Sequence, residues 1–441
     1  MDIDSIRKSL SGKPFFCDFR HLSISSRSVG IKDGEPESRG GVEEGISVRA
    51  FRNGSWGFAS GPLSDFEKLL SRAEKLASAG SGNSKYPPRH SEISYPKKSA
   101  HFHPSGSESM IESCESLYSE MEDGKIRNRQ IRLSELLTHR VYANSAGAHL
   151  EDERLLIYSR FTCVGKEGTV TQEGHHTWGS REKWEEEQLF ASAREAKRKC
   201  LDSLAALPPP SGTCTVILDN EMAGVFAHEA VGHACEGDAI QEGSSILQGK
   251  KGLQIGSDLV SIWDSPELEG AFGSYSFDDE GMPGKAENLI QNGVLHGFLH
   301  SAESAFSLGE APNGHARAET FGVPPIVRMS NTYIERGDHS VDELLDVDEG
   351  IYVKGMNGGS VDIITGQFMF RAEEAFRIHK GVLGDRIRGL SITGTIIDTL
   401  KEVDAVGSDF QMKPGFCGKN GQTMNVSDGG PHIRVRSMKV G

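Results

Sequence analysis

The stretch Phe226-Ala227-His228-Glu229-Ala230-Val231-Gly232-His233 places two imidazoles around a carboxylate on a predicted helix. Imidazole is a preferred ligand of catalytic zinc, and zinc lowers the pKa of a bound water to about 7. A neighbouring glutamate can take that water's proton, which is the chemistry of hydrolases. The stretch therefore predicts a metal site with His228 and His233 as ligands and Glu229 as the general base. The structural alternative is that both histidines are ordinary core or surface residues.

The spacing of the two histidines constrains the shape of this helix. Five positions separate them, which places them about 140° apart on an ideal helix, too far to share one ion. A π-type turn winds more residues per turn and returns positions i and i+5 to one face. Gly232 lies where such a distortion is easiest. The sequence thus predicts a helix that is locally overfull or that ends at Gly232.

A catalytic zinc usually takes three protein ligands, so a third ligand is expected. Cys417 is the best candidate, in the glycine-rich loop Gly415–Gln422. Glycines let the backbone turn a thiolate inward, and Lys419 nearby would favour the thiolate. A buried free cysteine is the structural alternative. Glu236 and Asp238 are rival ligands by proximity, although such residues are more often solvated carboxylates.

The composition limits the class of protein. The chain has 441 residues, 36% of them hydrophobic, with 52 glycines that indicate substantial β structure. Its net charge of −15 argues against a general nucleic-acid partner. No apolar run nears the roughly 20 residues of a membrane span. The seven scattered cysteines and the absence of an apolar signal core after Met1 predict a cytoplasmic protein.

The expected fold class is α+β. The prolines Pro208–Pro210 predict a boundary between an N-terminal α/β region, residues 1–207, and a β-rich, mainly antiparallel C-terminal domain, residues 212–441, that carries the metal-site motifs. An Asn53-Gly54 turn joins two strands, and Asp219 or Asn220 caps the helix that carries the histidines. The expected helices cover 64–77 (capped by Ser64), 107–122, 180–204, 340–345 and 396–403, and an exposed connection covers 78–104. The expected strands cover 46–51, 130–160 with a break at 144–147, 215–218, 294–300, 351–354, 360–370, 375–379, 387–392 and 433–438.

Five short blocks, in order, resemble the TldD branch of the TldD/PmbA metallopeptidases. They are His228–Asp238, Phe277–Gly281, Arg328–Ile334, Gly358–Ile363 and Cys417–Gln422. The resemblance implies a cytosolic peptidase that binds zinc (Zn2+) through His228, His233 and Cys417 and uses Glu229 as general base. It also implies peptide substrates in an unfolded or extended form, and a homodimer or a heterodimer with a related family member.

Two alternatives remain open at this stage. The chain could be a zinc amidohydrolase acting on a small substrate, in which case a closed pocket is expected in place of a roomy groove. It could also be a non-catalytic subunit of a protease dimer, with a structural metal whose fourth ligand is Glu236 or Asp238. For the oxyanion stabiliser of an enzyme, the candidates are His175, His176, His315 and Tyr333.

Overall fold

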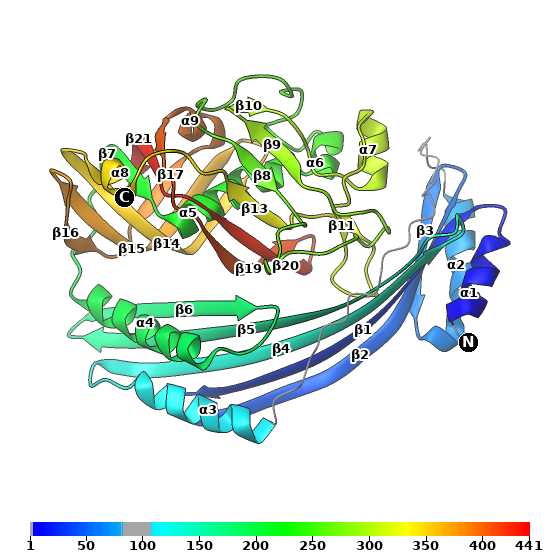
Figure 1. The fold of residues 1–441 in the computed structure, drawn as a ribbon, viewed down its shortest axis with the longest axis horizontal. Coiled ribbons are helices and arrows are strands. Elements are labelled where there is room, and N and C mark those ends of the chain that lie inside the picture. Colours follow the sequence, from blue (N-terminus) through cyan, green and yellow to red (C-terminus); the bar gives the residue numbers. More distant parts are fainter. Residues whose placement is uncertain (1–2, 81, 83–106) are drawn as a thin grey trace.

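The computed structural model of the protein describes residues 3–80, 82 and 107–441. The first half of the chain forms a long curved sheet, and the second half lies over the concave side of that sheet (Figure 1). The second half consists of smaller sheets with short helices between their strands (Figure 1). Most of the connection predicted over 78–104 lies outside the described residues.

The N-terminal sheet has six antiparallel strands in the order β3-β2-β1-β4-β5-β6. Positive φ angles at Asn53 and Gly54 form the tight turn between β2 and β3, which confirms the predicted hairpin. The predicted break near 144–147 is the turn between β4 and β5. The strands are β1 (Phe16–Lys32), β2 (Glu35–Arg52), β3 (Ser55–Gly61), β4 (Ile126–Asn144), β5 (His149–Glu167) and β6 (Val170–Ser180).

Helices pack against both ends of this sheet. α2 crosses β3 so closely that a Cβ on Gly57 would lie 1.9 Å from the carbonyl oxygen of Ala73. Ser64 lies in a short helix before α2 and does not cap it, because α2 begins at Phe66. The helices of this half are α1 (Ile3–Ser11), η1 (Leu63–Asp65), α2 (Phe66–Ala79), α3 (Ser107–Glu120) and α4 (Glu186–Leu204).

The C-terminal half contains two larger sheets, ordered β10-β9-β8-β13-β20-β19 and β14-β7-β21-β17-β15-β16. Their pairings are antiparallel except for β7 with β14 and β13 with β20, so the predicted α+β class with a mainly antiparallel C-terminal half is confirmed. The strands are β7 (Gly212–Leu218), β8 (Ile262–Asp264), β9 (Glu287–Gln291), β10 (Val294–Leu295), β11 (Ala316–Arg317), β12 (Ile326–Val327), β13 (Asn331–Ile334), β14 (Glu349–Asp362), β15 (Gln367–His379), β16 (Val382–Ile387), β17 (Ser391–Thr395), β18 (Val403–Val406), β19 (Gln411–Lys419), β20 (Gln422–Gly430) and β21 (Ile433–Val440). The helices are α5 (Asn220–Val225), η2 (Phe226–Gly232), η3 (His233–Cys235), α6 (Gly237–Glu242), α7 (Ala302–Leu308), α8 (Val341–Leu345) and α9 (Ile396–Lys401).

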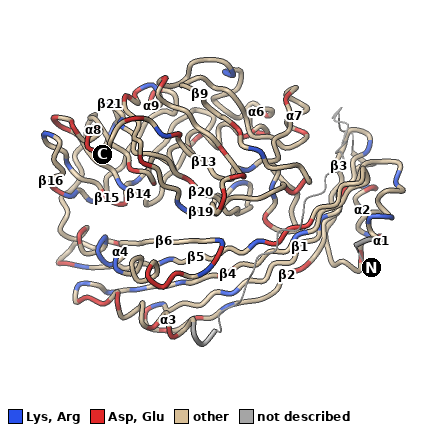
Figure 2. The backbone as a smooth tube through the Cα atoms, viewed as in Figure 1, with Lys and Arg blue, Asp and Glu red and all other residues tan. Residues whose placement is uncertain are grey.

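A buried ion-pair network joins the two halves. Arg140 on β4 contacts Asp152 at 2.9 Å and reaches Asp279 of the C-terminal half at 3.1 Å. Arg49 on β2 contacts Glu280 at 2.9 Å. Acidic and basic residues are interspersed along these strands (Figure 2). Because an unpaired charge is costly in a protein interior, the network fixes the position of the C-terminal half relative to the sheet.

Several expected elements differ from the structure. The strand expected over 387–392 is not one strand, because β16 ends at Ile387 and β17 begins at Ser391. The helix expected over 180–204 begins at Glu186, because β6 continues to Ser180. The strand expected over 294–300 has only two residues. The segment 360–370 is not a single strand: β14 ends at Asp362, the chain turns, and β15 begins at Gln367.

Within the described part of the chain, no helix combines the length and apolar character needed to cross a membrane. The division at 207/212 stays a prediction.

Candidate metal centre

The helix that carries both histidines follows strand β7. Asp219 is its cap: its Oδ1 accepts a hydrogen bond of 2.8 Å from the backbone N–H of Met222. The helix starts as α5 and widens into a π-helix over Phe226–Gly232, which confirms the overfull turn predicted from the histidine spacing. A side chain at Gly232 would collide with Met329, whose sulfur lies 2.0 Å from the position of a Cβ.

The π-turn brings His228, His233 and Cys417 together. One ligand atom from each of the three lies within 4.8 Å of the others. The Nε2 of His233 is 3.3 Å from the Sγ of Cys417, although 184 positions separate them in the chain. Cys417 lies in strand β19, just before the turn to β20, and not in a loop as expected. Arg328 holds this hairpin by donating to the carbonyl oxygens of Cys417 at 2.5 Å and Gln422 at 3.1 Å.

Each histidine of this triad has a carboxylate at its other ring nitrogen. The Nδ1 of His228 is 2.6 Å from Oδ1 of Asp428, and the Nδ1 of His233 is 3.1 Å from Oε2 of Glu236. Such a partner fixes the orientation and the tautomer of a metal-binding imidazole. Asp428 was not singled out from the sequence, because nothing in its neighbourhood on β20 marks it as a partner of a residue 200 positions away.

The two rival ligands have other partners. Glu236 contacts Lys419 at 3.1 Å as well as His233, and Asp238 contacts Lys419 at 2.7 Å. Neither belongs to the cluster formed by His228, His233 and Cys417. A single lysine is therefore shared between these two carboxylates.

The Cys417 thiol is biased toward the thiolate. Burial opposes ionisation, but the charges and hydrogen bonds of His228 and His233 outweigh it and lower the pKa of Cys417 to about 5. A thiolate is the form that binds metals. The histidines thus supply the effect that the sequence attributed to Lys419.

Glu229 lies beside the triad in a cavity of about 470 Å3. The cavity wall comes from η2, from α6, from the end of β14 and from the β19–β20 turn. Its lining residues include Glu229, His233, Glu236, Asp238, Glu242, Ser360, Val361, Ile363 and Lys419.

None of the four oxyanion candidates is among the described lining residues of this cavity. His315 is fully buried and hydrogen-bonded to Asp264 and Asn313. The ring of Tyr333 contacts that of Phe410 edge to face. His175 lies 3.5 Å from Glu373. Burial and Lys199 lower the pKa of His176 to about 3, so His176 is neutral at ordinary pH.

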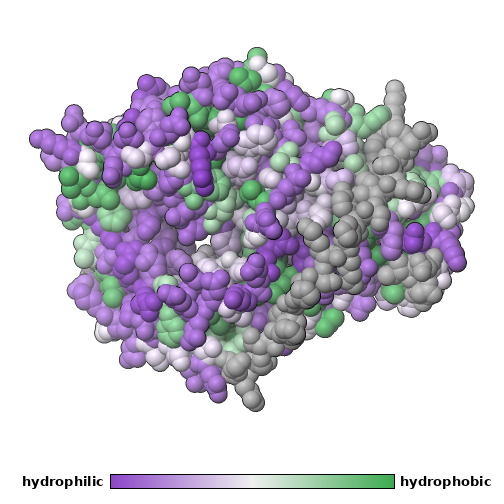
Figure 3. All heavy atoms as spheres, viewed as in Figure 1, coloured by the Kyte–Doolittle hydropathy of each residue, from purple (hydrophilic) through white to green (hydrophobic). Residues whose placement is uncertain are grey.

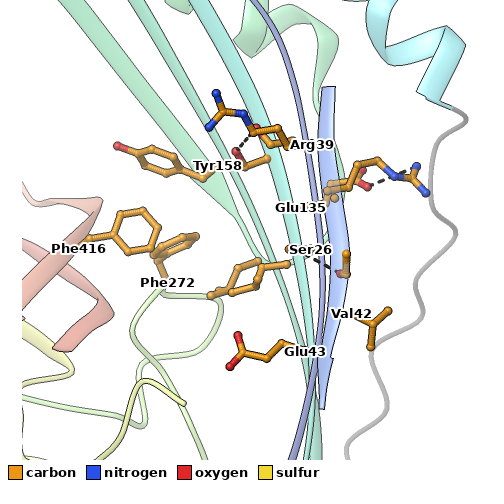
Figure 4. Close-up of a pocket in the computed structure, with 15 residues that line it drawn as sticks. Ser26, Arg39, Val42, Glu43, Glu135, Tyr158, Phe272 and Phe416 are labelled. Atoms are coloured by element: carbon orange, nitrogen blue, oxygen red, sulfur yellow. Dashed lines mark hydrogen bonds and ion pairs between the residues drawn. The ribbon is translucent and has the colours of Figure 1, made fainter. Parts of the chain in front are cut away.

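A second cavity, of about 630 Å3, lies between the concave face of the N-terminal sheet and β19. The surface is hollowed between the two halves (Figure 3). Phe416 packs against Tyr158 and Phe272 with ring centroids 5.1 and 5.5 Å apart, while Val42 points away from these rings (Figure 4). Side chains alternate along a strand, so Phe416 and Cys417 face opposite sides of β19 and the two cavities are separate.

Three family models match successive parts of the chain. They are described as PmbA/TldA metallopeptidase domain 1 over residues 17–79, the central domain over 100–204 and the C-terminal domain over 211–441. The chain therefore belongs to the PmbA/TldD family of metallopeptidases, which confirms the resemblance drawn from the sequence blocks.

Similar proteins cover the full length of the chain. A metalloprotease of Methanothermobacter thermautotrophicus is 37% identical, with 100% of each chain aligned. A protein of Saccharolobus solfataricus named zinc metalloprotease TldD homolog is 29% identical, with 97% of this chain and 96% of the relative aligned. TldE from Thermococcus kodakarensis shares the fold, with a TM-score of 0.78 at 18% identity over 99% of this chain and 98% of that chain.

Proposed function

We propose that this metallopeptidase-family chain is a zinc-dependent peptidase acting on unfolded or extended peptides. His228, His233 and Cys417 hold the metal, and Glu229 is the general base. One observation carries the proposal: two imidazoles, each with a carboxylate at its Nδ1, meet a thiol of lowered pKa within 4.8 Å.

The donor set fits zinc. Two imidazoles and one thiolate suit this ion, and three protein ligands leave a fourth position for water in a catalytic site. The carboxylates of Asp428 and Glu236 supply the partners that zinc-bound histidines ordinarily have. When bound, zinc would lower the pKa of a water to about 7 and polarise the scissile carbonyl.

The protein groups then have separate tasks. Glu229 lines the same cavity as His233 and takes the proton of the attacking water. The same carboxyl group passes the proton to the leaving amine. Asp428 keeps the ring of His228 in one orientation, and Glu236 does the same for His233.

One edge of β14 has no strand partner beyond Val353 among the described residues, which supports an extended peptide as the substrate. On one side β14 pairs with β15 as far as Asp362, whereas β7 pairs with its other side only at Ile351–Val353. Ser360 and Val361, beyond that pairing, line the cavity of Glu229. A peptide can add to such an edge through main-chain hydrogen bonds, which give affinity with little dependence on side chains. The neighbouring stretch Gln367–Phe370 has strand partners on both sides and is not available.

The same contacts weigh against the two alternatives. Among the described residues, the ligand cluster contains only His228, His233 and Cys417, and Glu236 and Asp238 lie outside it, paired with Lys419, which weighs against a closed four-ligand structural site. A cavity bordered by a strand edge suits an extended peptide better than a compact small molecule.

From the family resemblance we also propose a dimer, of identical or related subunits, and a cytoplasmic location, without nucleic-acid or membrane partners. Light scattering on the purified protein tests the dimer.

The first experiment is elemental analysis of the purified protein, of Cys417→Ala and of Glu229→Gln, combined with cleavage of an unfolded polypeptide. We expect about one zinc per chain in the wild type and in Glu229→Gln, loss of zinc in Cys417→Ala, and cleavage by the wild type only. If Cys417→Ala retains its zinc, another residue must be the third ligand. Cleavage by Glu229→Gln would refute its role as base.

A further inference from the structure

The cavity beside the triad has an excess of negative charge. Four carboxylates line it, those of Glu229, Glu236, Asp238 and Glu242, against one lysine, Lys419. Lys419 is already shared between Glu236 and Asp238, at 3.1 and 2.7 Å. Glu242 is exposed and has no ion-pair partner among the described residues. The cavity therefore offers a carboxylate that no cation of the described protein neutralises.

A second observation points to a missing donor in the same wall. Glu236 is only 1% exposed, and its Oε1 has no hydrogen-bond partner among the described residues. A buried carboxylate oxygen without a donor is unfavourable, so a hydrogen-bonding cation in this cavity would relieve it. Glu242 is also the last residue of α6, where the backbone carbonyls add negative partial charge.

The position of Glu242 relates this charge to the path of a bound peptide. α6 ends at Glu242, and the same cavity is lined by Ser360 and Val361 near the end of β14 and by Ile363 just after it. In an extended chain, alternate side chains point to the same side. A peptide paired with β14 would thus present every second side chain, or its own terminus, to a wall containing Glu242.

We propose that Glu242 selects peptides with a positive charge on the bound segment, carried by a Lys or Arg side chain or by a free α-amino group. The inference rests on the proposed peptidase function and adds its substrate class. A single ion pair that remains partly solvated changes affinity by about fivefold. Salt should reduce the preference, because the screening length falls to about 3 Å at 1 M.

Binding can be measured without turnover. Zinc-loaded Glu229→Gln protein is titrated into dye-labelled peptides of one sequence: acetylated and neutral, acetylated with one lysine, and neutral with a free amino terminus. Fluorescence anisotropy gives each Kd at low and high salt. The same titrations are made with Glu229→Gln/Glu242→Gln, and with Glu229→Gln/Glu182→Gln as the charge-matched control, since Glu182 is exposed and outside the cavity lining.

We expect a cationic peptide to bind about fivefold more tightly than the neutral one, a ratio that falls to about one in the Glu242→Gln protein and stays in the Glu182→Gln control. Preference for the lysine peptide alone identifies a side chain as the charge, and preference for the free amine alone identifies the terminus. Equal affinities in the Glu229→Gln protein, or an undiminished ratio after Glu242→Gln, would overturn the inference. The proposed function fails separately, if the zinc-loaded wild type cleaves none of the peptides.

Discussion

Asp428→Asn is expected to weaken zinc binding by about 10- to 100-fold while leaving the fold intact. Oδ1 of Asp428 lies 2.6 Å from Nδ1 of His228, and that imidazole is only 3% exposed, so water does not readily replace the lost carboxylate. The substitution keeps the size of the side chain and removes its charge. Loss of such a partner typically costs this factor in metal affinity, which corresponds to about 1.4–2.7 kcal/mol.

The assay is competition for zinc with a chromogenic chelator at pH 7. Glu349→Gln is the matched control, because Glu349 also lies 2.6 Å from a histidine Nδ1, that of His379, but on the exposed surface. The control should bind zinc as the wild type does. An Asp428→Asn protein with a zinc Kd within twofold of the wild type, or an equal loss in the control, would show that the carboxylate does not support the metal ligand.

Three further predictions concern stability. Asp279→Asn removes a buried partner of Arg140 and should lower the free energy of unfolding by about 3 kcal/mol in urea titrations; an unchanged midpoint would contradict the importance of the network. Burial would raise the pKa of Asp279, but Arg140 and its neighbours hold it below the usual value. That stabilisation is complete above the ordinary pKa of about 4 and is lost as the pH falls, so acid unfolding should be less steep in Asp279→Asn than in the wild type. Gly57→Ala should lower the free energy of unfolding by about 3 kcal/mol, because its Cβ would lie 1.9 Å from a backbone oxygen. Gly41→Ala, whose Cβ would have nothing within 4 Å, should change that free energy by less than about 0.5 kcal/mol. Equal shifts of the thermal midpoint in the two variants would refute the packing argument.

The features that the sequence predicted well are local. The five-residue spacing of His228 and His233 demands a π-turn as soon as both are assigned to one ion, and the structure has it over Phe226–Gly232. The turn at Asn53-Gly54 follows from the ease with which these two residues adopt positive φ. Both predictions depend on neighbours within a few positions.

The features that were missed depend on distant parts of the chain. Asp428 becomes a partner of His228 only through the pairing of β20 with β13 and the packing of β20 on the histidine helix. Apolar residues lie on both sides of the turn after Asp362, so their occurrence over 360–370 alone could not separate two strands of a hairpin. The first ten residues of β2 are not buried on either face, so they lack the alternation of buried and exposed side chains by which a strand is predicted.

The π-turn and the β19–β20 hairpin meet across 184 positions of sequence. An ion bound there would act as a cross-link that closes a very long loop, and closing a loop removes conformational freedom from the unfolded chain. Binding to the folded form alone would also stabilise that form by mass action. The persistence of the protein in the cell and its activity would then respond together to the supply of one metal, so that scarcity would remove the protease itself and not merely silence it.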